Sequence, residues 1–311
     1  MKSKEKLLMN RSIVEFFKIP ESIRIPLITG WNYKWALKAD NKAIKKEKIK
    51  QALNTEKREE TITVSLTSYP KRINCVYLAV KSLMVQTYKP DRIVLWLADE
   101  QFPTRELPKE LTDLVQYGLE IRYCEADLLG HKKYFYALRE QKENEIVITV
   151  DDDIIFSKNM IKRLMKKHKK FPGCVICERG QVLDKTNMDM PGRWTTISSV
   201  GVKKPTYSMN GSPGGGMLIP YGAFYPDATD EGKVRELAFR ADDVWNMFMC
   251  AQNKTRMIKT RKYHRIFSTV TESQVEQLAT GNVGGNNYAV VMEKLRATYP
   301  DAWQRIYTDK D

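Results

Sequence analysis

The chain has 311 residues, 42% of them hydrophobic and 10% aromatic, which is enough for a sizeable core and unlike a disordered composition. Its formal net charge of +14 favours anionic partners such as nucleic acid, anionic lipid or phosphorylated small molecules. No apolar run approaches the ~18 residues that a membrane-spanning helix needs, and charges interrupt the stretch 1–17 too often for a secretory signal. Five irregularly spaced cysteines give no disulfide framework, so we expect a cytoplasmic protein.

The first part of the chain, residues 1–58, is a basic N-terminal extension. Residues 1–60 contain 15 Lys and Arg against 8 Asp and Glu, which supplies half of the net charge. Within it, the Lys-rich stretch 41–57 predicts a helix. A second basic cluster, residues 157–170, has seven Lys and Arg, no acid, and apolar residues at helical spacing, which indicates a helix with a solvated basic face. Both patches are compatible with peripheral attachment to the inner face of the cell membrane.

From Thr61 onward, short apolar runs alternate with segments of helical period. The runs TITVSL, RIVLWL and EIVITV are typical of strands that are covered on both faces in a parallel sheet. Apolar stripes at 73–84 and, more weakly, at 107–117 predict helices between them. The alternation predicts an α/β, Rossmann-like domain with a mostly parallel central sheet over residues 59–270. In residues 271–311 we expect a flexible loop followed by a final helix.

Three consecutive carboxylates, Asp151, Asp152 and Asp153, directly follow the run EIVITV. Like charges side by side repel by ~1 kcal/mol at 4 Å in water, and ligands of open α/β sheets bind at the carboxyl ends of strands. In an extended backbone, Asp151 and Asp153 would point to one side and Asp152 to the other. Two hard-oxygen ligands on one side suit Mg²⁺ or Mn²⁺ together with substrate phosphates. The alternative is a turn and capping cluster that is held by lysines.

The segments TVSLTSYPKR, DDD and the later ADDVW resemble, in order and spacing, a GT-A fold glycosyltransferase of the bacterial family-2 type, over roughly residues 61–268. Enzymes of that type build capsule, lipopolysaccharide or other surface glycans. The resemblance therefore implies a nucleotide-diphosphate sugar donor, a glycan or lipid-linked acceptor, and Mn²⁺ or Mg²⁺ on the donor diphosphate. It implies Asp153 as a metal ligand, Asp151 at the ribose or at the metal with its bound water, and Asp152 between them.

A second acidic site lies in ADDVW, residues 241–245, just before a helical stripe. Glycosyl transfer with inversion needs a base for the acceptor proton, and a metal can stabilise the departing diphosphate. The resemblance assigns the base to Asp243, with Asp242 as the runner-up. The alternative is a helix N-cap, because Asp at a helix start bonds free backbone N–H groups. Capping accounts for one carboxylate and not for two.

Other contacts with the nucleotide sugar are implied by position along the strands. Family members bind the base and ribose after the first strand, read the base after the second, and bring a lysine from the stretch GHKKYFYAL. Consecutive glycines in GSPGGGMLIP let backbone approach a substrate closely. Ordinary turns, a loop acid and solvated lysines are the alternatives. The expected contacts are Thr67, Ser68, Tyr69, Arg72, Asp99, Lys132, Lys133, Asp151, Asp152, Gly215 and Gly216.

A late histidine, His264, lies where some GT-A enzymes supply a histidine to the metal, although a lone histidine is more often structural. Two other function classes stay open. A nucleic-acid enzyme would explain the charge and the paired carboxylates, but we recognise no nucleic-acid-binding motif and expect no such partner. The second is a non-catalytic nucleotide-sugar-binding protein of the same fold, against which the presence of both Asp153 and Asp243 argues.

Overall fold

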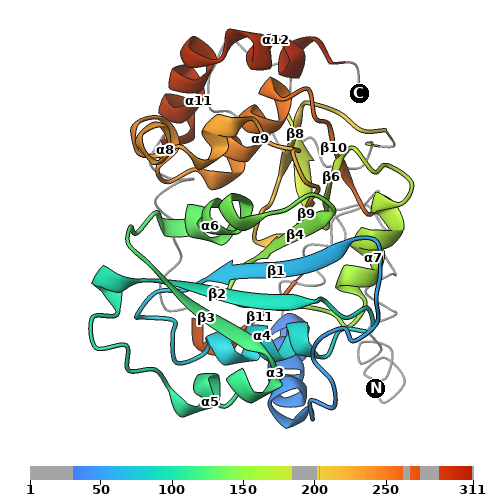
Figure 1. Ribbon diagram of the computed structural model, residues 1–311, viewed down its shortest axis with the longest axis vertical. Coiled ribbons are helices and arrows are strands. Elements are labelled where there is room, and N and C mark those ends of the chain that lie inside the picture. The colour runs from blue at the N-terminus through green and yellow to red at the C-terminus, as the bar shows by residue number, and fades with distance from the viewer. Residues whose placement is uncertain (1–30, 184–201, 203, 262–266, 274–286, 310–311) are drawn as a thin grey trace.

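The structure is a computed structural model, and it describes residues 31–183, 202, 204–261, 267–273 and 287–309. Its centre is a seven-stranded sheet with the order β10-β6-β9-β4-β1-β2-β3 (Figure 1). Neighbouring strands are parallel except at β9, which is antiparallel to both β4 and β6. The expected α/β fold with a mostly parallel sheet is confirmed. The strands are β1 (Thr61–Thr67), β2 (Arg92–Ala98), β3 (Leu119–Cys124), β4 (Glu145–Val150), β6 (Val175–Cys177), β9 (Gly215–Ile219) and β10 (Met257–Lys259), with small pairs β5 (Ile154–Ile155)/β11 (Ser268–Thr269) and β7 (Gly180–Val182)/β8 (Met209–Gly211).

Helices cover the sheet on both faces, so alternate side chains of one strand enter two different apolar clusters. In β9, Met217 and Ile219 lie in one cluster and Leu218 lies in the other. Helices α6, α8, α9, α11 and α12 complete the first cluster, and α4, α5 and α7 complete the second (Figure 1). A strand covered on both faces buries side chains on both of its faces, and most of those side chains are apolar. The helices are α3 (Trp31–Lys46), α4 (Val76–Met84), α5 (Lys109–Thr112), α6 (Lys132–Glu140), α7 (Met160–His168), α8 (Glu231–Ala238), α9 (Asp242–Gln252), α11 (Asn287–Thr298) and α12 (Pro300–Thr308).

The described part of the N-terminal extension packs on the α/β body. Asn41 Nδ2 donates to the carbonyl of Thr269 at 2.9 Å, and Ile44 packs in a small apolar cluster with Val270. The expected helix over residues 41–57 is wrong in its bounds, because α3 ends at Lys46 and irregular backbone follows it. At the end of α3, Lys81 Nζ donates to the Lys45 carbonyl at 2.8 Å, a contact that helix propensity, a weak local preference, does not predict.

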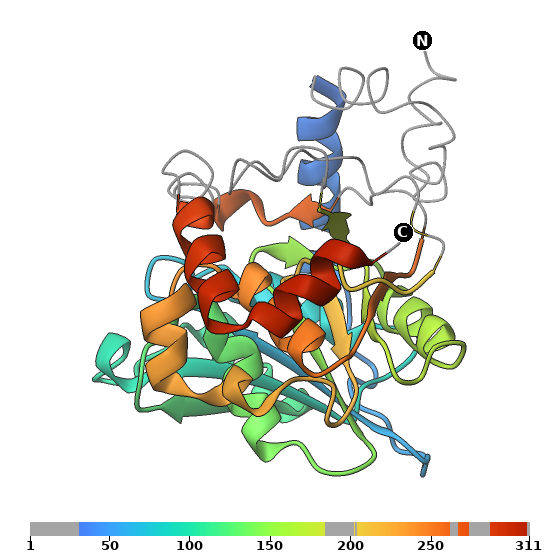
Figure 2. The same cartoon turned by 90° about the horizontal axis from the view of Figure 1, so that it is seen from above.

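The C-terminal segment forms two helices where one was expected. Pro300 opens α12, and proline suits the first position of a helix because it has no N–H to leave unsatisfied. Both helices lie over α9 (Figure 2), with Leu295 and Ile306 fully buried. Within the described ranges, no helix is both long and apolar enough to cross a bilayer.

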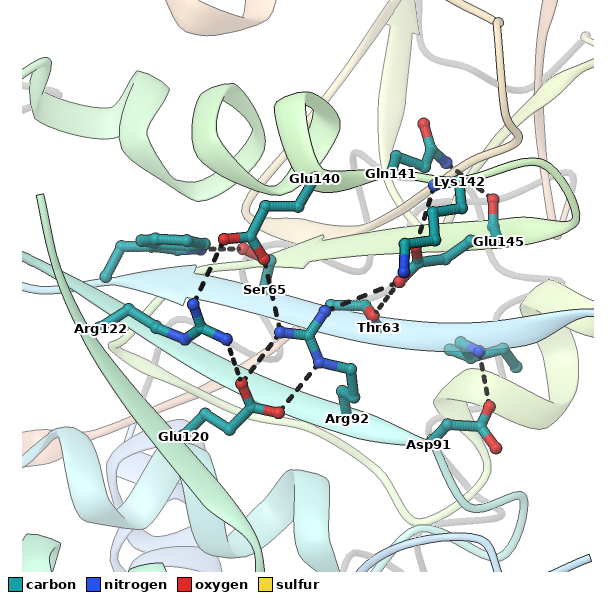
Figure 3. A network of polar contacts seen from close by, with 12 residues as sticks. Thr63, Ser65, Asp91, Arg92, Glu120, Arg122, Glu140, Gln141, Lys142 and Glu145 are labelled. Carbon is teal, nitrogen blue, oxygen red and sulfur yellow. Dashed lines mark hydrogen bonds and ion pairs between the residues drawn. The ribbon is translucent and has the colours of Figure 1, made fainter.

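An ion-pair network ties the amino ends of the central strands together (Figure 3). Arg92 of β2 donates two hydrogen bonds of 2.9 Å to Glu120 of β3, and Arg122 joins Glu120 to Glu140 at the end of α6. These side chains are partly exposed, so each pair stabilises the fold by less than about 1 kcal/mol. Their effect is to fix which residues of neighbouring strands lie side by side, at the end of the sheet opposite the acids.

Candidate active site

The aspartate triplet lies in a turn at the carboxyl end of β4. β4 ends at Val150 and β5 begins at Ile154, so residues 151–153 are not extended strand. The alternation of side chains expected from the sequence therefore does not apply, because that rule holds only for extended backbone. The turn instead directs Asp152 and Asp153 to Arg72 and Asp151 to Lys133. Since β1 and β2 run parallel to β4, their carboxyl ends lie at the same edge of the sheet.

The middle carboxylate, Asp152, points into the protein with 6% of its side chain exposed. Ser68 Oγ donates to its Oδ2 at 2.6 Å, and the Arg72 guanidinium donates to its Oδ1 at 2.8 Å. Arg72 also lies 3.0 Å from Asp153 Oδ2. Ser68, Arg72 and Asp152 were all expected from the sequence to contact the nucleotide sugar. In this arrangement Ser68, Arg72 and Asp152 hold the turn after β1 against the turn after β4, and so position the other two carboxylates.

Asp151 and Asp153 keep part of their side chains exposed, 40% and 18% respectively. Burial and the charge of Asp151 together raise the pKa of Asp153 to about 6. Two neighbouring carboxylates that repel each other fit a Mg²⁺ or Mn²⁺ ion, which binds through one or two carboxylates and completes its shell with water and phosphate. The described residues contain no group of three or more protein ligands for a metal, and the expected ligand His264 lies outside them.

Gly214 lets Asp151 occupy its place in the site. A Cβ atom at this position would lie 1.6 Å from Asp151 Oδ2, and the Asp151 N–H donates to the Gly214 carbonyl at 2.9 Å. The sequence predicted close backbone approach at Gly215 and Gly216, but both are buried within β9. A Cβ on Gly215 would meet the Phe267 ring at 2.9 Å, and Gly216 has a φ of +101°, which an L side chain rarely adopts.

The second acidic pair, Asp242 and Asp243, occupies the first turn of α9. The N-cap position belongs to Ala241, which makes no side-chain cap bond, so neither aspartate is the N-cap. Asp242 Oδ2 lies 3.0 Å from Lys133 Nζ. Gly130 packs directly against this carboxylate, since a Cβ atom there would lie 2.9 Å from the same oxygen.

The two acids of this pair differ in protonation. Burial and the neighbouring charge of Asp242 raise the pKa of Asp243 to about 6. Burial acts in the same direction on Asp242, but the ammonium of Lys133 outweighs it and holds the pKa of Asp242 below its usual value. One carboxylate of the pair therefore stays ionised, while the other exchanges a proton near neutral pH.

Lys133 joins the two acidic groups. Its Nζ lies 2.6 Å from Asp151 Oδ1 and 3.0 Å from Asp242 Oδ2, with 6% of the side chain exposed. Burial alone would lower the pKa of Lys133, but the two carboxylates outweigh burial and raise it. Ser65 Oγ of β1 donates to the Lys133 carbonyl at 2.5 Å, which fixes the first turn of α6 on the sheet.

The other expected contacts lie near the same edge of the sheet and already have partners within the chain. Tyr69 and Asp99 follow β1 and β2, with side chains that are partly exposed, whereas Lys132 is buried. The sequence suggested Lys132 and Lys133 equally, but only Lys133 contacts the two acidic groups of the site. The partners are Asp127 and Gln101 for Lys132, Arg105 for Asp99, the carbonyl of Trp96 for Thr67, and the guanidinium of Arg72 for the Tyr69 ring.

Unsatisfied polar atoms gather around the first two turns of α9. Among the described residues, nine buried side-chain N or O atoms lack a hydrogen bond, and four of them belong to Asn210, Asp242 and Asn246. Asp242 Oδ2 is one of the four, although it has the ion pair with Lys133. Both amide atoms of Asn246, one helical turn after the acids, are unbonded. Unbonded buried amide atoms such as those of Asn246 cost about 1–3 kcal/mol each and are rare in folded proteins.

Several residues of the site were not expected from the sequence. Gly214 belongs to the glycine run GSPGGGMLIP, in which the sequence pointed to Gly215 and Gly216. Asn210 Nδ2 of β8 and the Tyr288 hydroxyl of α11 each lie 3.1 Å from Asp243 Oδ2. No motif marks either residue, because the chain brings them together from positions 33 and 45 residues away from Asp243.

No family model matches this chain, and no curated protein does. Among solved structures it is similar to S. aureus TarS 1–349 (TM-score 0.43, 16% identity, 65% of this chain and 59% of that one). It is also similar to the mannosyltransferase PcManGT from Pyrobaculum calidifontis in complex with GDP-Man and Mn²⁺ (0.44, 13%, 97% and 84%). A third is glucosyl-3-phosphoglycerate synthase from Mycobacterium tuberculosis (0.41, 11%, 78% and 80%). The chain thus spans less than two thirds of the TarS fragment. At TM-scores below 0.5 these likenesses carry no weight for function, which rests on the chain's own residues.

Proposed function

We propose that this protein is a metal-dependent, inverting glycosyltransferase that moves a sugar from a nucleotide-diphosphate donor to a glycan or lipid-linked acceptor. The observation that carries the proposal is the position of Lys133 between the two acidic groups, 2.6 Å from Asp151 and 3.0 Å from Asp242. One group, at the carboxyl end of β4, suits a cation and its diphosphate. The other group, at the start of α9, supplies a base near that cation site. Transfer of a sugar from a nucleotide diphosphate to a hydroxyl needs both a cation for the diphosphate and a base for the hydroxyl proton.

Asp151 and Asp153 would hold a Mg²⁺ or Mn²⁺ ion. When bound, such an ion acts as a Lewis acid that stabilises negative charge on the departing diphosphate. Lys133 and Arg72 add fixed positive charge at the same place, and their ion pairs keep the carboxylates in position. Both cations are largely buried, so they act where water screens their charge less than at the surface.

Asp243 is assigned as the general base. It takes the proton of an acceptor hydroxyl as the hydroxyl oxygen bonds to the anomeric carbon of the donor. The bond from that carbon to the diphosphate oxygen breaks, and its electron pair leaves with the nucleoside diphosphate. A pKa of about 6 leaves Asp243 mostly ionised at neutral pH yet basic enough to accept a proton. Asp242 is the weaker candidate, because Lys133 holds its pKa down.

The test compares Asp243→Asn with Asp242→Asn. Asn is nearly isosteric with Asp and accepts no proton at neutral pH. Asp243→Asn should keep the affinity for Mn²⁺ and nucleotide sugar while the transfer rate falls by ~10²–10⁴-fold. Asp242→Asn should have the smaller effect on rate. If Asp242→Asn is inactive and Asp243→Asn turns over, the two roles are exchanged. If both variants transfer sugar normally, the proposed base catalysis is wrong.

A surface-glycan role and attachment to a membrane surface are the finer part of the proposal. The outer face of α7 and the turn that follows it carry exposed lysines, and Lys158 at its start forms an ion pair with Glu47 in the segment after α3. The start of α7 therefore lies beside the basic segment that follows α3, in one region of the surface. Anionic lipid attracts such a region, which would bring the enzyme to a lipid-linked acceptor.

A further inference from the structure

The hydrogen bonds of Asp243 distinguish its two oxygens. Oδ2 accepts from Asn210 Nδ2 and from the Tyr288 hydroxyl, both at 3.1 Å. Oδ1 accepts from the backbone N–H of Val244 at 2.9 Å. An ionised carboxylate offers about two acceptor sites on each oxygen. Both sites of Oδ2 are thus occupied by side-chain donors, and Oδ1 keeps one site.

One of the two side-chain donors comes from the C-terminal helices. Tyr288 lies in the first turn of α11, and the segment that carries it is fixed at further points. Tyr299 donates to Asp227 Oδ2 at 2.8 Å, and Asp309 Oδ2 accepts from Thr206 Oγ1 at 2.7 Å. Helices α11 and α12 lie beside α9 (Figure 2), and apolar residues of all three helices belong to one cluster. The phenol therefore reaches Asp243 from an anchored segment.

Resting on the proposed function, we propose that Asn210 and Tyr288 are positioning residues that saturate Oδ2 of Asp243, so that Oδ1 is the oxygen that accepts the acceptor's proton. Two donors on one oxygen and a backbone N–H on the other hold the carboxylate plane against rotation. Such preorganisation matters, because an error of about 1 Å in the place of a reacting group can cost about 10²-fold in rate. The C-terminal helices thereby become part of the active site.

The charged groups around Asp243 leave this arrangement intact at neutral pH. Burial and the charge of Asp243 raise the pKa of Tyr288, so its phenol remains a donor. Asp242 on the same helix is paired with Lys133 of α6. His131, which precedes α6, is neutral, because burial lowers its pKa to about 4. The remaining donor, the amide of Asn210, does not titrate.

Tyr288→Phe is the test, and Tyr299→Phe is its matched control. Both changes remove one phenol hydroxyl that donates to a partly buried aspartate, and both act on the anchoring of the same C-terminal helices. They differ only in the aspartate they release, Asp243 or Asp227. The assay is sugar transfer from, or hydrolysis of, UDP-glucose, UDP-N-acetylglucosamine and GDP-mannose with Mn²⁺, measured as kcat/KM against pH alongside thermal unfolding.

In Tyr288→Phe, the acid limb of kcat/KM should move to higher pH by roughly one unit, because a lost donor no longer favours the ionised carboxylate. We expect kcat to fall about tenfold while KM for the donor changes less than twofold. Asn210→Ala should behave in the same way. In Tyr299→Phe, the unfolding temperature should fall while the pH limb stays in place. An unshifted limb in Tyr288→Phe, or an equal shift in Tyr299→Phe, would overturn the proposal.

The inference is also testable without turnover, so its failure is distinguishable from failure of the proposed function. Carbon-13 NMR of the aspartate carboxyls, assigned with Asp243→Asn, follows the titration of Asp243 in the nucleotide-free protein. A higher pKa of Asp243 in Tyr288→Phe than in wild type and Tyr299→Phe supports the positioning role of Tyr288, even if no nucleotide sugar proves to be a substrate. An unchanged titration refutes that role, whether or not the wild-type protein transfers sugar.

Discussion

Replacing Gly214 by alanine would probe the place of Asp151 with a single methyl group. The Cβ atom would lie 1.6 Å from Asp151 Oδ2, whereas heavy atoms in contact stand roughly 3.2–4 Å apart. The carboxylate must therefore move by roughly 1.5 Å or more. Gly214 is not among the glycines with positive φ, so the alanine backbone itself is not strained. The substitution therefore displaces the Asp151 carboxylate without changing the backbone conformation at residue 214.

The cost to folding should be small, and the cost to binding should be large. Moving Asp151 breaks its ion pair with Lys133, but 40% of the Asp151 side chain is exposed, so solvent screens much of that loss. Alanine also restricts the unfolded chain, which offsets about 0.4–1 kcal/mol. Net destabilisation should stay within about 1 kcal/mol, or roughly 2 °C in Tm. A carboxylate displaced by more than 1 Å should weaken Mn²⁺-dependent nucleotide binding by about 10²-fold, equivalent to about 2.7 kcal/mol.

Calorimetric titration of UDP and GDP, with and without Mn²⁺, measures this change. Asp153→Ala serves as the comparison that removes a proposed metal ligand outright. Gly173→Ala is the matched control, because a Cβ atom at Gly173 meets no heavy atom within 4 Å, and it should bind as wild type does. If Gly214→Ala keeps its Mn²⁺-dependent affinity, then Asp151 is not at the metal and nucleotide, and that part of the site is misassigned.

Three further outcomes are expected. Asp152→Ala should lower the free energy of unfolding by about 3 kcal/mol in a denaturant titration, because it breaks the buried pair with Arg72; a loss under 1 kcal/mol would remove its structural role. Transfer should fall at least tenfold per pH unit below pH 6, where Asp243 and the proposed metal ligand Asp153, both with pKa raised to about 6, become protonated; a flat profile down to pH 5 would argue against this base. Lys166→Glu on α7 should weaken binding to anionic vesicles by roughly tenfold at low salt, while Lys109→Glu on α5 should not; equal behaviour of the two variants would exclude α7 as the docking face.

The sequence by itself determined the layered fold and the chain positions of the acids. A strand that is covered on both faces is rich in apolar and β-branched residues, so β1, β2 and β4 could be recognised from their composition. The helix pattern after ADDVW likewise placed Asp242 and Asp243 at the start of α9. These features depend on short stretches of chain, and periodicity records the burial of such stretches directly.

Only the tertiary structure decided which acids act together. Nothing local distinguishes Lys133, which reaches two carboxylates, from Lys132, which pairs with Asp127. Asp152 was expected to contact the nucleotide sugar, but it bonds Ser68 and Arg72 inside the protein. The reason is that residues 151–153 form a turn and not the extended backbone on which the alternation rule depends. The sequence also did not predict the end of α3, where Lys81, from a distant part of the chain, donates to the Lys45 carbonyl.

The hydrogen-bond donors to Asp243 are also features that only the tertiary structure decided. Asn210 and Tyr288 lie in different elements, one in β8 and one in α11, and neither stands in a recognisable motif. A hydrogen bond depends on the distance and direction between two groups, which the packing of whole elements sets. Composition and periodicity describe one segment at a time, so they can place an acid at a strand end or a helix start but cannot name the side chain that approaches it from elsewhere in the chain.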